Sequence, residues 1–391
     1  RREGNTCANC HNPEGRGNAP LSYPPFDPEE EIEVNEKIFG RLETTAKLNK
    51  NHLVTAGIEY QIDRTDRRVV LLPNTDKDIS TQAGYLQDQI GFGDGRLTLI
   101  LGGRYDDHEV VGGNLSSRVL GAYSPSERLT LRAGWSTGVR APTWTELNLD
   151  QYLVPGRDPA DTTAQIAAVL YRGNRDLREE TIRSFDVGGE YRFSDNFGAK
   201  ASLFYSRLDR FIGLRQKPEV GSNYDIHTWE NSPRGKLYGG ELELHLRGGD
   251  LLKSLIHYTY QKVDVGREPS LNPSYAPRHK IFTQLTLTPT KMLKIYGIVS
   301  HWRDFKSSYF RLGMPLEPFS VAKLDLDPYT MLETTVTYMI PLGAGNRMIM
   351  LSLVGENLLD DERAYYSRAA ANIVDSHNLG RQYMFMIMYM F

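Results

Sequence analysis

Apolar and polar residues alternate along much of this chain, most clearly in its last eleven residues, Arg381 to Phe391. Successive side chains of a strand point to opposite faces, so alternation with period two predicts a strand. One face of this segment is aromatic or aliphatic, and the other holds four methionines and a glutamine. The first face carries Tyr383, Phe385, Ile387, Tyr389 and Phe391. A buried strand of a soluble sheet would also alternate. Whether this apolar face contacts membrane lipid or a protein core must therefore be judged from the rest of the sequence.

The same two-faced pattern recurs upstream in segments 97–106, 129–136 and 241–247. In each of them, residues such as Leu99, Leu131 and Leu244 alternate with polar or small residues. Repeated strands of this kind predict a sheet with one apolar face and one polar face.

The connections between these segments alternate in length. Short turns are expected at 49–51, 94–95, 124–126, 194–196, 248–250, 289–290 and 343–346. Long polar loops are expected at 142–180, 265–277, 306–328 and 359–380. Short turns at one end and long loops at the other are typical of barrels in the bacterial outer membrane. The sequence therefore predicts an all-β fold, a transmembrane antiparallel β-barrel with short periplasmic turns and long extracellular loops.

We count about fifteen strands between Glu30 and Phe391. Because the last strand must end on the periplasmic side, an odd count places residues 1–28 in an extracellular loop and 29–391 in the barrel. Plugged transporters have 22 strands, so seven would precede this segment. The chain begins at Arg1 without a signal peptide, and we expect it to be part of a longer precursor.

Charge and hydropathy further limit the kinds of protein that this chain can be. The net charge of the 391 residues is −3, which gives no electrostatic reason to expect a nucleic acid partner. No apolar run approaches the 18 residues of a transmembrane helix. The mean hydropathy of −0.46 is compatible with a barrel, whose strands are apolar only at every second residue.

Five short motifs occur in an order that resembles the TonB-dependent outer-membrane receptor family. Residues 135–147 resemble its G-F-R-A-P-T-x-x-E-L stretch, and 174–181 its N-P-x-L-K-P-E stretch. Residues 231–243 resemble an N…G…G-x-E strand entry, 276–280 an A-P-x-H-K motif, and 355–362 an x-N-L-x-D-K stretch. The matching positions are Arg140, Ala141, Pro142, Asn174, Leu177 and Asn357, with Phe391 closing the chain. We interpret these residues as shaping the barrel, not as carrying chemistry.

The resemblance implies a 22-stranded barrel closed by an N-terminal plug and located in the outer membrane, with the lipid bilayer as its surroundings. Such receptors take up scarce large solutes, and the TonB complex, engaged through a region absent here, supplies the energy. A ferric siderophore or a related metal chelate is the expected small-molecule ligand. A passive porin is the simplest rival, and we expect no enzyme because no catalytic constellation occurs in the sequence.

The segment around Cys7, Cys10 and His11 has the Cys-x-x-Cys-His spacing at which c-type haem is attached. A second axial ligand would then come from His108, His227 or His377. The alternatives are a disulfide between the two cysteines, which suits an oxidising compartment, free thiols, or a metal site. Covalent haem would favour surface electron transfer as the function. Haem as the transported ligand is disfavoured, because the family's haem receptors carry a histidine where residues 143–173 have none.

Aromatic and cationic residues of the long loops are the candidates for ligand binding. Arginine offers charge-assisted hydrogen bonds and aromatic rings offer stacking surfaces to an anionic, partly aromatic chelate. The candidates are Tyr152, Arg157, Tyr171, Arg172, Tyr224, His227, Trp229, Tyr275, Tyr309, Arg311, Tyr365, Tyr366 and Arg368. Most of them are equally compatible with ordinary solvated loops.

Overall fold

The computed structural model describes residues 32–68, 75–153, 157–158, 161–165, 169–218, 225–264, 276–311, 320–343, 347–361, 364–366, 375–377 and 380–391. Its only helix within these ranges is α1 (Trp144–Asn148). The long strands are β1 (Ile32–Lys47), β2 (His52–Arg68), β3 (Thr75–Phe92), β4 (Leu97–His108), β5 (Gly112–Ser126), β6 (Leu129–Arg140), β11 (Glu180–Ser194), β12 (Phe197–Pro218), β13 (Asp225–Gly248), β14 (Leu252–Asp264), β15 (His279–Thr290), β16 (Leu293–Arg303), β19 (Tyr329–Pro341), β20 (Met348–Glu356) and β23 (Gln382–Met390). The short strands are β7 (Asp150–Leu153), β8 (Arg157–Asp158), β9 (Asp161–Gln165), β10 (Val169–Arg172), β17 (Phe305–Arg311), β18 (Ser320–Leu326), β21 (Ala364–Tyr366) and β22 (Asp375–His377).

The fifteen long strands form one antiparallel meander, in which each strand pairs with the next long strand along the chain. This number confirms the count made from the sequence. Two short strands join the same sheet to make seventeen: β10 pairs in parallel with β13, and β7 pairs with β10. Among the described pairings, β1 and β23 have a partner on one side only, so the sheet is curved but not closed.

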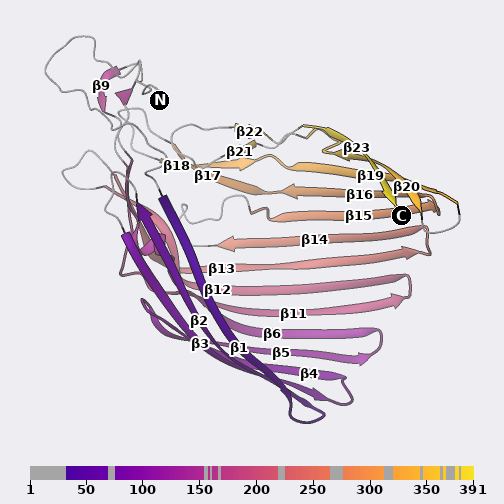
Figure 1. Ribbon diagram of the computed structural model, residues 1–391, viewed down its shortest axis with the longest axis horizontal. Helices are drawn as coiled ribbons and strands as arrows, with labels where there is room; N and C mark the ends of the chain where they lie inside the picture. Colours follow the sequence, from indigo (N-terminus) through magenta and orange to yellow (C-terminus); the bar gives the residue numbers. More distant parts are fainter. Residues whose placement is uncertain are drawn as a thin grey trace.

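The two ends of the sheet differ as predicted (Figure 1). Short turns join β1 to β2, β3 to β4, β5 to β6, β11 to β12, β13 to β14, β15 to β16 and β19 to β20. Two turns lie slightly later than expected, since β5 continues to Ser126 and β15 to Thr290. Four of the seven connections at the other end are long, and three of these contain the short strands. The other three are short, with three residues (109–111) between β4 and β5 and six each between β2 and β3 and between β12 and β13.

The register separates an apolar face from a polar face. Phe185, Tyr205 and Tyr238 lie directly opposite one another on β11, β12 and β13, and Phe185 is 52% exposed. Five residues further along β11, an odd number, the side chain of Glu190 points to the other face, opposite Lys200, which pairs with Glu243 at 3.1 Å. The exposed aromatic face and the ion-paired face are the two sides that the alternation predicts.

Within the described residues, no helix is both long and apolar enough to cross a membrane. Residues 1–31 lie outside the described part, so the predicted placement of 1–28 in an extracellular loop and the state of Cys7, Cys10 and His11 stay predictions.

Candidate functional site

The polar face of β1, β2 and β4 carries a row of ion pairs. Glu59 of β2 accepts from Arg41 of β1 at 2.6 Å and from Arg104 of β4 at 2.6 Å. Arg104 also contacts Asp106, two residues further along its own strand, at 2.8 Å. The side chain of Glu59 is only 10% exposed, so its charge is balanced by two guanidinium groups. The sequence placed Arg104 and Asp106 on a polar face, but it gave no signal for Glu59 as their partner, because that contact depends on register.

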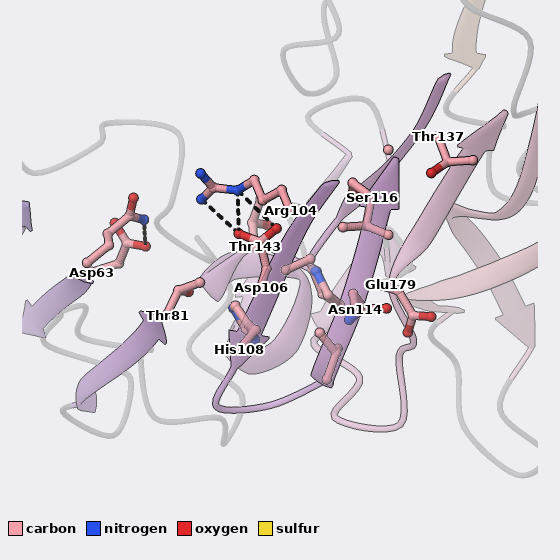
Figure 2. Close-up of a pocket in the computed structure, with 16 residues that line it drawn as sticks. Asp63, Thr81, Arg104, Asp106, His108, Asn114, Ser116, Thr137, Thr143 and Glu179 are labelled. Carbon is pink, nitrogen blue, oxygen red and sulfur yellow. Dashed lines mark hydrogen bonds and ion pairs between the residues drawn. The ribbon is translucent and has the colours of Figure 1, made fainter. Parts of the chain in front are cut away.

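A pocket of about 530 Å³ opens at the long-loop end of this row of ion pairs (Figure 2). Its lining comes from β2 to β6 and from the segment that follows β6. The labelled lining residues are Asp63, Thr81, Arg104, Asp106, His108, Asn114, Ser116, Thr137, Thr143 and Glu179. A second pocket of about 450 Å³ lies beside it and shares Arg104, Ser116 and Thr137. The polar face is therefore hollowed over six strands, β1 to β6, which suits a polar or charged solute more than an apolar one.

His108 presents a donor to the larger pocket. Its Nδ1 atom lies 3.2 Å from the backbone nitrogen of Val110 and accepts that hydrogen bond. With Nδ1 acting as acceptor, the neutral ring carries its proton on Nε2. The sequence suggested His108 only as a haem ligand, which stays untested, and the structure places it among the pocket-lining side chains.

Arg140, the last residue of β6, joins the two ends of the long segment between β6 and β11. Its guanidinium bonds both oxygens of Glu180 at 2.6 and 2.7 Å, and both oxygens of Glu146 at 2.9 and 3.1 Å. Glu146 also belongs to a capping box with Thr143, which fixes the start of α1. We call Arg140, Glu146 and Glu180 the base clasp.

An apolar cluster lies next to the base clasp. Ile79 of β3, Leu147 of α1, Leu177 and Ile212 of β12 are each at most 5% exposed. Trp144 and Trp229 pack against them. In a protein whose other large apolar residues mostly face outward, this cluster acts as a small core that holds the segment between β6 and β11 against β3 and β12.

Two asparagines connect the motifs that the sequence singled out. Asn174 donates from Nδ2 to the carbonyl of Trp229 at 2.9 Å. Asn231 accepts from the backbone nitrogen of Arg178 at 2.8 Å and donates to the carbonyls of Arg178 and Arg210. The first three sequence motifs thus meet at one place, where these side chains hydrogen-bond to the backbone. That they only shape the barrel stays a prediction.

The fifth motif also makes local contacts. Asn357 is 3% exposed, has a φ of 48°, and exchanges hydrogen bonds with the backbone of Asp361. Asparagine tolerates this left-handed conformation better than most residues. Ala141 and Pro142 line the larger pocket, and Phe391 is 97% exposed.

The loop residues predicted to bind ligand are distributed over several elements. Trp229 packs on the apolar cluster and His227 is 3% exposed, whereas Arg172 is exposed. The parallel pairing of β10 with β13 brings Tyr171 opposite His227. Tyr152, Arg157, Tyr309, Arg311, Tyr365 and Tyr366 lie in short strands of the loops. Tyr224, Tyr275 and Arg368 fall outside the described residues. A role in ligand binding stays a prediction for all of them.

Among the side chains that the structure describes, no group of three or more histidines, cysteines or carboxylates is arranged to hold a metal ion.

Residues 11–358 match the protein family described as TonB dependent receptor-like, beta-barrel. The chain belongs to the TonB-dependent receptor family. The TonB-dependent receptor fold sets the orientation of the barrel, with short turns on the periplasmic side and long loops outside the outer membrane.

Relatives and solved structures agree with this assignment. The chain is 29% identical over 279 residues to the ferric enterobactin receptor of Pseudomonas aeruginosa, a match that covers 67% of this chain and 36% of that receptor. It is 24% identical over 301 residues to the iron-regulated outer membrane virulence protein of Vibrio cholerae, covering 73% and 43%. The chain thus spans less than half of these relatives.

Crystal structures show the same fold. The ferric enterobactin receptor of P. aeruginosa superposes with a TM-score of 0.69 at 21% identity, over 92% of this chain and 54% of that one. The siderophore receptor PirA from Acinetobacter baumannii gives a TM-score of 0.67 at 18% identity, over 89% and 53%.

Proposed function

We propose that this barrel is part of an outer-membrane receptor that imports a ferric siderophore or a related metal chelate, energised by the TonB complex. The observation that carries the proposal is the similarity of two thirds of the chain to a ferric enterobactin receptor. The polar pocket supports it, because it lies on the lumen-facing side near the extracellular end.

Hydrogen-bonding groups in the pocket suit a hydroxyl-rich chelate. His108 supplies a hydrogen-bond donor within one wall, and the guanidinium of Arg104, paired with Glu59 and Asp106, lies in the same wall. Charge-assisted and neutral hydrogen bonds from a fixed wall orient a ligand without large rearrangement. We expect this wall to guide the chelate from the loops into the lumen.

The test is uptake of iron-55 by iron-starved cells that lack their own siderophore receptors and express the full-length precursor. We expect uptake of a ferric catecholate that stops when a protonophore collapses the inner-membrane proton gradient or when TonB is deleted. Uptake that continues under both conditions would identify a passive porin. Absence of uptake for catecholate, hydroxamate and citrate chelates would refute the proposal.

A matched pair of variants tests the pocket itself. Replacing His108 by Ala removes one hydrogen-bond donor, and a loss of about 1 kcal/mol corresponds to an increase of about fivefold in the substrate concentration at half-maximal uptake. His257→Ala is the control, because that residue lies opposite Phe282 on β15 and does not line the pocket. Equal effects of the two variants would contradict a role for the pocket.

A further inference from the structure

Two aromatic groups mark the height of the apolar band on β11 and its neighbours. The outer group is Phe185, Tyr205 and Tyr238, which lie directly opposite one another. The inner group, next to the short turn, contains Phe193, whose ring stacks on Phe197 at 4.8 Å. Eight residues separate Phe185 from Phe193, or about 26 Å along the strand. With the tilt of about 40° usual for such barrels, this is about 20 Å of height, close to the band that lipid tails cover.

A row of cations lies just outside the outer aromatic group. Arg183 of β11 is directly opposite Arg207 of β12, which is directly opposite Lys236 of β13. Each residue is two positions beyond its aromatic neighbour in the direction of the long loops and therefore points to the same apolar face. We call these three residues the outer cation row. Two residues add about 7 Å along the strand, which places the row at the level of lipid headgroups.

Like charges directly opposite on neighbouring strands are destabilising unless something neutralises them. The carboxylates nearby are Asp209 and Asp264. Asp209 contacts Arg207 at 3.2 Å and is shared with Arg234 at 3.5 Å. Asp264 lies opposite Lys236, and Lys262 lies over the ring of Tyr238 at 5.9 Å. This part of the face therefore holds five cations and two carboxylates.

Two members of the outer cation row carry charges that no described carboxylate neutralises. Arg183 and Lys236 are exposed, and neither makes a side-chain ion pair or hydrogen bond with any other residue that the structure describes. The neighbouring strand on the other side offers Thr137 opposite Arg183, which brings no charge. The row is a cationic strip without enough protein anions, facing the lipid side of the barrel at its extracellular end.

We propose that the outer cation row binds the phosphate groups of phosphorylated glycolipids in the outer leaflet. Guanidinium groups bind phosphate bidentately, and adjacent cations at headgroup height match a lipid with two phosphates. The aromatic group below would then contact the glycolipid's upper acyl region. This role concerns how the barrel sits among its lipids, and it is independent of the solute that the receptor imports.

The experiment is native mass spectrometry of the full-length receptor in detergent with added diphosphoryl lipid A. The test variant is the triple substitution Arg183→Gln, Arg207→Gln and Lys236→Gln. The control is Lys253→Gln, Lys280→Gln and Lys294→Gln, which removes the same charge from exposed lysines whose register places them on the polar face. Thermal unfolding followed by circular dichroism verifies that both variants are folded.

We expect the test variant to lose lipid A adducts at least fivefold and the control to bind as the wild type does. Enzymatically dephosphorylated lipid A should bind the wild type no better than it binds the test variant. An equal loss in both variants, or no loss in either, would overturn the proposal. In a mixture of lipid A and inorganic phosphate at equal concentration, the wild type should retain lipid A. If it retains inorganic phosphate instead, the row is a simple ion site and the proposal is overturned.

Discussion

Individual residues on the strands have opposite roles depending on which face they occupy. Leu131 lies opposite Tyr123 and Gly189, and Gly189 is midway between the two aromatic groups on β11. Leu131 is 45% exposed on the apolar face, where we expect it to face lipid near the middle of the membrane. The next residue, Arg132, points to the polar face and lies 3.3 Å from Glu190.

We predict that Leu131→Arg lowers the free energy of unfolding by about 2–4 kcal/mol, because it moves a charge into the centre of the lipid band. Arg132→Leu should change it by less than about 1 kcal/mol, since the pair with Glu190 is exposed on both sides. Urea titration of the refolded full-length protein in lipid vesicles measures both. Comparable losses would mean that the two faces are assigned the wrong way round.

At the scale of elements, the base clasp determines how the segment between β6 and β11 leaves the barrel. Glu146 and Glu180 are 14% and 13% exposed, so removing their shared cation leaves two partly buried carboxylates close together. Close packing reinforces the clasp, because a Cβ on Gly173 would lie 2.6 Å from the backbone nitrogen of Asn148.

We predict that Arg140→Leu makes this segment open more often, with a local cost of about 1–2 kcal/mol, or about 5–30-fold in the open fraction. Limited proteolysis of outer-membrane vesicles should show cleavage between residues 141 and 179 that is faster by this factor. Arg132→Leu on the same strand is the control and should leave the cleavage rate unchanged. Unchanged cleavage of Arg140→Leu would show that the apolar cluster alone holds the segment.

The elements that the sequence predicted are those whose signal is local. Alternation and turn residues are sufficient for the long strands and the short turns. The helix α1 was not predicted, although the Thr143–Glu146 spacing of a capping box marks its start. The base clasp, the apolar cluster and β10 were not predictable in this way. Arg140 and Glu180 are 40 residues apart, and Asn174 and Trp229 are 55 apart, so their contacts depend on the register of the sheet.

At the scale of the whole molecule, strand parity fixes the side of the membrane on which each end lies. β23 follows a long connection and runs toward the short-turn end, as the fifteen-strand count requires. From the same parity we predict that the segment before β1, including Cys7 and Cys10, lies outside the cell.

We predict that a membrane-impermeant maleimide labels Cys7 on intact cells after mild reduction. A disulfide would require the reductant, and free thiols would react without it. Covalent haem would leave both cysteines unreactive, add the mass of haem, and give a Soret absorption band. Labelling only after the periplasm is opened would contradict the strand parity.

The anchoring of the segment between β6 and β11 also affects how such a receptor can diversify. The anchor consists of residues 140–149 and 173–180, together with Ile79, Ile212, Trp229 and Asn231 on the neighbouring strands. The tip between β7 and β10 can therefore be lengthened or exchanged without altering the wall, and doubling a flexible loop costs only about 0.6 kcal/mol in closure entropy. The tip can therefore evolve new ligand-binding surfaces while the barrel wall stays the same. Selection for ligand recognition would act on the codons of the tip, and selection for membrane insertion on the codons of the strands.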